Sequence, residues 1–372
     1  MTGIYVHIPF CKSRCSYCGF YSTTRIEMRQ RYIEAVAKEA RLRPTNDTIG
    51  TIYLGGGTPS QLSDQQLRQL FDALYNIYKV GSGAEVTIEC NPDDITDDFV
   101  KTLVQLPVNR VSMGAQTFDD NRLRFLNRRH AAAQVPLAVQ RLRDGGIRNI
   151  SVDLMYGFPG ESLDDWQRDI DAVLALDVEH ISAYCLTIEE GTVLFEQLKN
   201  GENEGMRNWE DEELERTMYE LLMDKLAAAG YEHYEISNFA RPGFRSRHNT
   251  SYWTDVPYRG LGAAAHSYDG QRRQWNVSDL MQYITGVENG TPVVEWEELD
   301  ADTRYNDRVM LSLRTSEGLE LAVLDEHDRT YLLPLAKKYL DEGLLILSAG
   351  RLRLSRRGLF VSDMVISDLM RV

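Results

Sequence analysis

Short apolar segments alternate with amphipathic helical segments over the first 235 residues of this 372-residue chain, and this order constrains the fold most strongly. In the helical segment 64–78, for example, Leu67, Leu70, Phe71 and Leu74 fall on one face. Parallel strands joined by crossover helices wind in one direction. We therefore expect an α/β fold with a partial (β/α)6 barrel similar to a TIM barrel. The six expected strands are 4–8, 51–54, 85–90, 110–116, 147–154 and 180–186.

The expected strands carry apolar residues on one face and polar residues on the other. This is unusual, because a closed barrel of this type fills its interior with bulky branched side chains. If the apolar faces pack against the helices, the polar side chains point inward, near the strand ends where such folds bind ligands. A polar interior predicts a polar occupant. The inward residues are Tyr5, Glu89, Gln116 and Asp153.

Composition excludes several classes of partner. The chain has 41 Lys and Arg residues against 56 Asp and Glu residues, a formal net charge of -15, which argues against nucleic acid because duplex binding needs a cationic surface. No apolar run reaches the length of about 18 residues that spans a membrane. Segment 4–10 lacks the features of a secretory signal. We expect a cytoplasmic protein with at most peripheral membrane contact.

The second part of the chain has a different pattern. We expect a loop-rich connecting region over 237–300, with one helix near 279–287. From 301 to 372 we expect a compact helical unit that ends in a hairpin of strands 344–347 and 351–354. Such a unit resembles a winged helix, a module that need not bind DNA. The expected division of the chain is therefore 1–236, 237–300 and 301–372.

Three of the five cysteines, Cys11, Cys15 and Cys18, lie together directly after the first expected strand. An odd number of cysteines without an export signal argues against a disulfide framework. Zinc usually takes a fourth ligand from a second Cys or His pair, and the sequence has no such pair at a fixed distance. Three thiolates on one tight loop suit a 4Fe–4S cluster whose fourth iron is open to an outside ligand. Three structural cysteines are the alternative interpretation.

The segment Ile-Pro-Phe-Cys-Lys-Ser-Arg-Cys-Ser-Tyr-Cys, residues 8–18, resembles the signature of radical S-adenosylmethionine (SAM) proteins, and in particular of the oxygen-independent coproporphyrinogen III oxidase family. Gly55-Gly56-Gly57-Thr58-Pro59 is similar to the glycine motif of this family, where absent side chains let the backbone approach the methionine amine. The resemblance covers essentially the whole chain. It implies that the three cysteines hold a 4Fe–4S cluster and that the open iron chelates SAM.

The same resemblance implies roles in SAM binding for the inward polar residues. Tyr5 is similar to a tyrosine beside the sulfonium, and Tyr17 to a residue near the adenine. Arg128, in Leu126-Asn127-Arg128, resembles the arginine that pairs with the methionine carboxylate. Asp153 resembles a ribose-binding aspartate, although a helix cap or salt bridge is the ordinary role of one inward carboxylate. The complete implied set is Tyr5, Tyr17, Gly56, Gly57, Thr58, Glu89, Gln116, Arg128 and Asp153.

Two branches of this family differ in function. The oxidase abstracts hydrogen from propionate side chains of coproporphyrinogen III, whereas the other branch is regarded as heme chaperones that pass heme to acceptor hemoproteins. Three features favour the chaperone. The triad begins at residue 11, so the N-terminal extension of the oxidase is expected to be absent, and Phe20 stands where the oxidase has a further cysteine. Residues 248–253, His-Asn-Thr-Ser-Tyr-Trp, resemble the HNxxYW motif of the chaperone branch.

A heme carrier needs an apolar surface for the macrocycle, cations for the propionates and an axial ligand such as histidine. His248, with Tyr252, Trp253 and Arg245 near it, supplies these in one segment and is a candidate heme ligand. The alternative is that the aromatic residues fix this loop to the barrel while His248 bonds to the backbone. His266 has no assigned role. The resemblance suggests respiratory hemoproteins as heme acceptors, and an exposed cluster loop is compatible with a homodimer.

Overall fold

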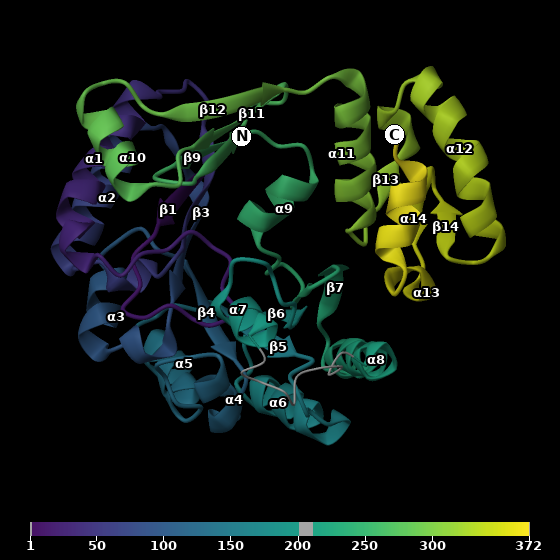
Figure 1. The fold of residues 1–372 in the computed structure, drawn as a ribbon, viewed down its shortest axis with the longest axis horizontal. Helices are drawn as coiled ribbons and strands as arrows, with labels where there is room; N and C mark the ends of the chain where they lie inside the picture. Colours follow the sequence, from purple (N-terminus) through teal and green to yellow (C-terminus); the bar gives the residue numbers. More distant parts are fainter. Residues whose placement is uncertain (1, 201–210, 372) are drawn as a thin grey trace.

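Six parallel strands form the centre of the structure, a computed structural model that describes residues 2–200 and 211–371 (Figure 1). Each strand pairs with the next one along the chain. This confirms the predicted partial (β/α)6 fold. The strands are β1 (Thr2–Ile8), β2 (Ile49–Gly56), β3 (Val80–Cys90), β4 (Arg110–Gln116), β5 (Asn149–Tyr156) and β6 (His180–Cys185).

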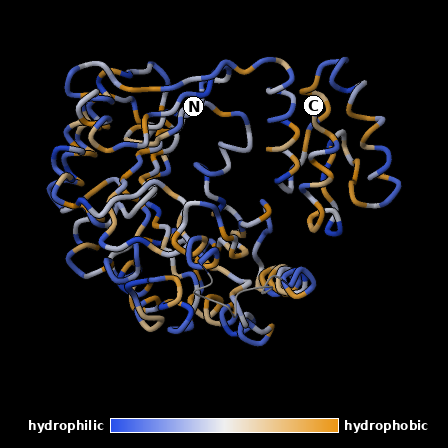
Figure 2. The backbone as a smooth tube through the Cα atoms, viewed as in Figure 1, coloured by the Kyte–Doolittle hydropathy of each residue, from blue (hydrophilic) through white to orange (hydrophobic). Residues whose placement is uncertain are grey.

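Helices in the connections bury the apolar face of these strands. Ile4, Val6 and Ile8 of β1 are fully buried and belong to one core with Leu67 and Leu70 of α2. In Figure 2 hydrophobic segments lie within the molecule and hydrophilic turns lie at its periphery. The helices are α1 (Arg29–Leu42), α2 (Asp64–Ile77), α3 (Asp97–Leu103), α4 (Asp120–Phe125), α5 (Gln134–Asp144), α6 (Leu163–Ala175), α7 (Val193–Lys199) and α8 (Glu212–Ala228).

Side-chain caps fix the beginning of α2 and of α6. The Ser63 hydroxyl accepts a hydrogen bond from the Gln66 N–H at 3.3 Å, and the Gln66 side chain accepts one from the Ser63 N–H at 3.0 Å. Ser162 and Asp165 form the same reciprocal cap at α6. These capping boxes satisfy N–H groups that the helix itself leaves without partners.

The structure corrects the expectation that residues 237–300 are loop-rich, because this segment contributes five strands to the sheet. Strand β9 is parallel to β1 and carries three further strands, while β7 and β8 lie beyond β6 at the opposite end. The expected helix near 279–287 is confirmed. The elements are β7 (Glu232–Glu235), β8 (Asn238–Ala240), α9 (Arg247–Trp253), β9 (Tyr258–Leu261), β10 (His266–Tyr268), β11 (Arg272–Asn276), α10 (Leu280–Glu288) and β12 (Val294–Glu298).

Residues after 300 form a smaller α+β unit with its own core, as predicted for a winged-helix-like unit. The expected hairpin is present, and its two-residue turn has positive φ at Ala349 and Gly350, 49° and 74°. The unit does not end at the hairpin, however, because α13 and α14 follow it. Its elements are α11 (Ala301–Leu313), β13 (Leu319–Glu320), α12 (Glu326–Asp341), β14 (Leu345–Ser348), β15 (Arg351–Leu354), α13 (Arg356–Leu359) and α14 (Ser362–Leu369).

Ion pairs and a ring contact attach this unit to the core near α9 (Figure 1). Arg314 pairs with Glu235 at 3.2 Å and lies over the Trp253 ring at 5.1 Å. Arg245 pairs with Glu317 at 3.1 Å. Among the described residues, no helix is long and apolar enough to cross a membrane.

A buried carboxylate fixes the added strands to α1. Glu39 is fully buried. It accepts hydrogen bonds from the Gly262 N–H at 2.8 Å and the Tyr283 hydroxyl at 2.7 Å. The Asn276 side chain donates a third at 2.8 Å, and Arg43 adds an ion pair at 3.0 Å. One side chain therefore satisfies donors from three separate parts of residues 258–288.

Replacing Glu39 with Leu removes this shared acceptor and leaves several buried donors without partners. We expect the free energy of unfolding to fall by about 3 kcal/mol, the loss typical when one partner of a buried ionic network is removed. Urea unfolding followed by circular dichroism measures it. The matched control is Glu34→Ala on the exposed face of the same helix, for which no loss is expected. Equal stability of both variants would contradict the assigned role of Glu39.

Candidate cluster and cofactor site

In five of the six central strands, a partly exposed position lies next to buried ones on the strand. These positions are Tyr5, Gly56, Glu89, Gly114 and Asp153. The outward residues between them are buried under the helices. The structure thus places three of the four predicted inward residues on an accessible inner face of the sheet, while the fourth, Gln116, is buried.

The three cysteines lie in the loop after β1 and are all partly exposed. The Cys11 sulfur lies 3.4 Å from the Thr58 hydroxyl, and the Cys15 sulfur lies 3.5 Å from an Arg128 nitrogen. Burial, together with the neighbouring Cys15 and Cys11, raises the pKa of the Cys18 thiol to about 11. A cationic group among the three sulfurs would therefore stabilise all of them as thiolates.

The donor set fits a cluster better than a single metal ion. Among the described residues, no group of three or more His, Cys, Asp or Glu side chains converges on one ion position. A structural zinc site needs such convergence. In a 4Fe–4S cluster each thiolate binds a different iron, so the sulfurs of one loop can stay apart.

The loop is held in place by backbone contacts to α4 and its C-terminal end. The Ser16 N–H donates to the Leu126 carbonyl at 3.1 Å, and the Ser16 hydroxyl donates to the Phe125 carbonyl at 3.0 Å. The Asn127 side chain donates to the Arg14 carbonyl at 2.7 Å. The segment that contains Arg128 therefore also positions the cysteines.

The glycine motif is explained first by packing. Gly56 has a φ of +106°, and a Cβ there would lie 2.3 Å from the His7 ring. A Cβ at Gly57 would lie 2.7 Å from the backbone of Pro9. Both glycines let the end of β2 pack against the end of β1, just before the cysteine loop. Close approach of a cofactor is a further role that this geometry permits.

Glu89 accepts two hydrogen bonds on the inner face, from the Tyr53 hydroxyl at 2.7 Å and from the Gly56 N–H at 3.0 Å. Burial raises the pKa of Glu89 to about 7; the Tyr53 hydrogen bond opposes this, and Asp153 adds to it. Sequence reasoning missed Tyr53. Its register pairing with Tyr5 puts both on the same face, and the rings stack at 6.2 Å.

Arg128 reaches the site from the end of α4. It donates to the Gly114 carbonyl at 2.5 Å and to Asn91 Oδ1 at 3.0 Å, while its buried Nε has no hydrogen-bond partner among the described residues. Gln116 has a φ of 67°, and its amide lies beside Gly114. The structure therefore places Arg128 beside Cys15, and brings both Arg128 and Gln116 against Gly114.

Asp153 and Tyr17 occupy the other side of the site. Asp153 accepts from the Ser112 hydroxyl at 3.4 Å, and burial raises the pKa of its carboxyl. Tyr17 packs against a small apolar cluster that includes Leu126 and Phe158. Burial raises the Tyr17 pKa, while nearby Arg128 lowers it.

The geometry of His248 does not support its predicted role as a heme ligand. The ring is fully buried, with Nδ1 hydrogen-bonded to the Thr51 hydroxyl at 2.8 Å and Nε2 to the Tyr252 hydroxyl at 2.9 Å. It stacks on Tyr53 at 5.1 Å. Burial lowers the pKa of His248 to about 3, and Arg110 contributes. The HNxxYW segment therefore fixes α9 to the inner face, through side chains instead of a backbone carbonyl.

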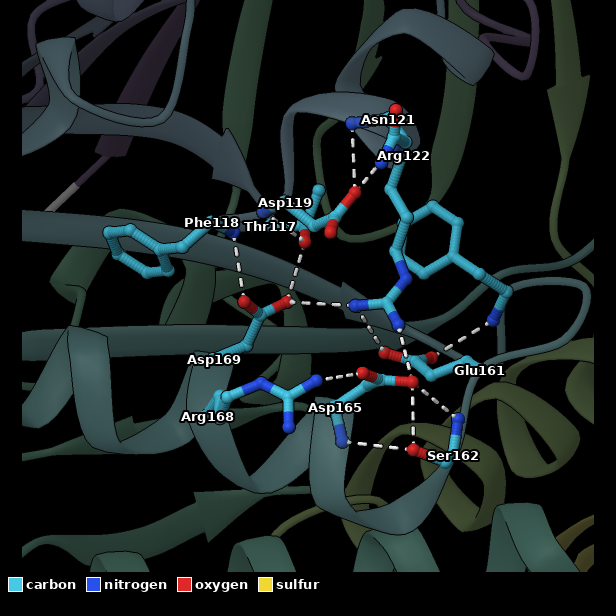
Figure 3. Close-up of polar contacts among 11 residues, drawn as sticks. Thr117, Phe118, Asp119, Asn121, Arg122, Glu161, Ser162, Asp165, Arg168 and Asp169 are labelled. Carbon is cyan, nitrogen blue, oxygen red and sulfur yellow. Dashed lines mark hydrogen bonds and ion pairs between the residues drawn. The ribbon is translucent and has the colours of Figure 1, made fainter.

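An ion-pair network that sequence reasoning missed connects α4 to α6 and the turn before it (Figure 3). Arg122 pairs with Asp165 at 3.0 Å and with Glu161 at 3.4 Å, and lies 3.9 Å from Asp169. Asp169 also accepts from the Thr117 hydroxyl at 2.6 Å. The partners lie 39 to 47 residues from Arg122 in the sequence, so no local pattern indicates the network. It ties α4 to the segments after β4 and β5.

Comparison with known proteins identifies the family. Residues 5–173 match the radical SAM superfamily, and residues 299–361 match the HemN C-terminal domain. A Mycobacterium tuberculosis protein named heme chaperone HemW is 35% identical over 376 residues, 99% of this chain and 94% of that protein. The chain belongs to the HemW family of radical SAM proteins. A second HemW, from Bacillus subtilis, is 37% identical over 325 residues, 86% of this chain and 85% of that protein.

The fold is also that of a solved enzyme. Coproporphyrinogen III oxidase (HemN) from Escherichia coli superposes with a TM-score of 0.83 at 21% identity and covers 99% of this chain and 90% of its own. At this low sequence identity, the superposition shows only that the two proteins share a fold. Membership of the radical SAM superfamily implies a 4Fe–4S cluster and SAM.

Glu161 gives the stability of the chain a specific pH dependence. Burial raises its pKa from the ordinary 4.5 to about 7. Between these values the folded chain keeps a proton that the unfolded chain has lost, so the Glu161 contribution to the free energy of unfolding falls as the pH rises from 4.5 to about 7. We expect Glu161→Gln to remove this part of the slope in urea unfolding measured across this range.

The exposed Glu34→Gln variant is the control and is expected to keep the wild-type slope. If Glu161→Gln shows that slope too, the carboxyl does not titrate in the way described.

Proposed function

We propose that this protein binds heme and delivers it to acceptor hemoproteins, and that it holds a 4Fe–4S cluster and SAM. The observation that carries the heme-chaperone role is the 35% identity to a protein named heme chaperone HemW over nearly the full length of both chains. The partly exposed cysteine loop beside the polar inner face supports the two cofactors.

The three thiols would each hold one iron, which leaves the fourth iron for SAM. A reduced cluster held there would supply an electron able to cleave the sulfonium bond of SAM. Cys11, Cys15 and Cys18 are the proposed ligands. The partly exposed position of all three on one loop, with the Thr58 hydroxyl against Cys11, supports this assignment.

Arg128 is the proposed partner of the methionine carboxylate, because its guanidinium lies beside Cys15 and retains a nitrogen without a hydrogen-bond partner in the described part of the chain. Glu89 and Asp153 are the proposed acceptors for the polar groups of the nucleoside and the methionine. Tyr5 is proposed beside the sulfonium, and Tyr17 beside the adenine. Gly56, Gly57 and Gln116 complete the proposed cofactor site.

The hemoprotein acceptors are proposed to be respiratory, and delivery rather than chemistry on the porphyrin is the proposed activity. Phe20 agrees with this, because an exposed aromatic side chain, 68% accessible, stands where the oxidase has a cysteine. The fold shared with the oxidase makes oxidation of coproporphyrinogen III the alternative that the experiment has to separate.

Hemin titration of the anaerobically reconstituted protein tests the carrier role directly. We expect saturable hemin binding, followed by loss of heme to a heme-depleted acceptor. In parallel, coproporphyrinogen III is supplied with SAM and a reductant, and no protoporphyrinogen is expected. Formation of protoporphyrinogen with turnover would contradict the proposal.

Cysteine variants test the cofactor assignment separately. Replacing Cys11, Cys15 and Cys18 with Ala is expected to abolish bound iron, sulfide and SAM. The control Cys185→Ala changes a partly exposed thiol at the end of β6. This variant is expected to keep its iron, sulfide and SAM. Iron and sulfide retained without the three thiols would overturn the assignment.

A further inference from the structure

The seven histidines, all within the described residues, differ in whether a ring nitrogen reaches the surface. His266 and His327 are exposed. The other five are buried or half-buried, and each has at least one ring nitrogen in a hydrogen bond. These five are His7, His130, His180, His233 and His248. An axial heme ligand must present a ring nitrogen to the iron, so only the two exposed residues qualify.

His266 lies at the edge of the sheet where the cysteine loop begins. Strand β9 is parallel to β1, so both end at this edge. A short turn then leads to β10, which starts at His266 and runs back. A Cβ at Gly262 in this turn would lie 2.7 Å from the His7 carbonyl oxygen, four residues before Cys11. His266 therefore lies on the rim beside the candidate cluster.

His266 also faces the same side of the sheet as the candidate SAM site. Tyr258 is aligned with Tyr268 across β9 and β10, and their rings lie 6.2 Å apart. His266 is two residues from Tyr268 on the same strand and therefore shares its face. Tyr258 in turn contacts Tyr252, at 4.7 Å, on the inner face. A ligand on His266 would project into the space that the cysteine loop borders.

Trp275 orients the imidazole without using its nitrogens. The two residues are paired across β10 and β11, with ring centroids 5.8 Å apart and planes 24° apart. The indole nitrogen of Trp275 donates to Glu295 at 3.1 Å, which fixes the indole in turn. Trp275 therefore offers aromatic surface beside an imidazole whose nitrogens make no hydrogen bond within the described residues.

His327 lacks these surroundings. It lies in the first turn of α12 in the C-terminal unit, next to the Asp325 cap that accepts a hydrogen bond from the Asp328 N–H at 2.8 Å. Within the described residues it makes no ring contact, whereas His266 has Trp275.

We propose that His266 is the axial ligand of the heme iron, with Trp275 as the residue that positions its ring. This inference rests on the proposed heme-carrier function. The lone pair of the neutral imidazole replaces a water or hydroxide on the ferric iron, so the iron keeps its oxidation state and no electron is transferred. An exposed ligand on a rim suits a carrier, because the heme can leave without unfolding of the protein.

Hemin titration of the full chain, followed by absorption spectroscopy, tests this assignment. We expect the wild type to show the spectrum of an imidazole-ligated heme. His266→Ala is expected to bind hemin at least about tenfold more weakly and to lose that spectrum, which free imidazole restores. The matched control His327→Ala, the other exposed histidine, is expected to behave as the wild type. Trp275→Phe is expected to preserve ligation, and Trp275→Ala to weaken it.

The outcomes separate the inference from the proposed function. Absence of saturable hemin binding in the wild type would overturn both. Wild-type binding with an unchanged spectrum in His266→Ala would overturn the assignment of His266 and leave the carrier function standing. Equal losses in His266→Ala and His327→Ala would also overturn it, because the effect would not depend on the rim. SAM binding, unchanged in His266→Ala, checks that the variant is folded.

Discussion

The helices of the core cover one face of the parallel sheet (Figure 1). Polar side chains such as Tyr5, Glu89 and Asp153 lie on the other face, where they are partly exposed. This division follows from the alternation within each strand, since burial of apolar residues under the helices turns their neighbours inward. Buried polar groups are costly without partners. The inner face supplies such partners, as where the Tyr53 hydroxyl bonds to Glu89 and α9 brings His248 against Thr51.

The cysteine loop depends on this arrangement because it is held mainly from outside itself. Its backbone is bonded to the end of α4, and α4 is tied through Arg122 to carboxylates that follow β5. The same segment delivers Arg128 to Cys15. One set of contacts thus fixes the positions of the three thiols and of Arg128, the proposed partner of the methionine carboxylate of SAM. Disturbance of this network would move the thiols and Arg128 together.

The predictable parts of the structure were those with a local signal. Periodicity predicts the six strands, and alternation predicts that Glu89 and Asp153 face inward. The same alternation would have found Tyr53. Strands β9 to β12 were missed because they are only three to five residues long and β12 is exposed along its whole length, so none gives an apolar run. Contacts between residues far apart in the sequence, such as the ion pairs of Arg122, leave no local pattern from which they could be predicted.

His248 and His266 illustrate this limit. In the sequence His248 begins the HNxxYW segment and has aromatic neighbours, whereas His266 has no assigned role. The structure makes His266 the better candidate for a heme ligand. Helix α9 folds onto the inner face and buries the His248 ring, while the turn after β9 leaves the His266 ring exposed on the rim. Which histidine reaches solvent depends on strand pairing between residues more than 200 positions apart.

Electron paramagnetic resonance of the reduced, anaerobically reconstituted protein, recorded before and after addition of SAM, tests the central claim most directly. A cluster held by three thiols with one open iron is expected to give the signal of a reduced 4Fe–4S cluster, and SAM is expected to change it by binding to that iron. A cluster signal that SAM leaves unaltered, or the absence of a cluster from reconstituted protein, would contradict the account.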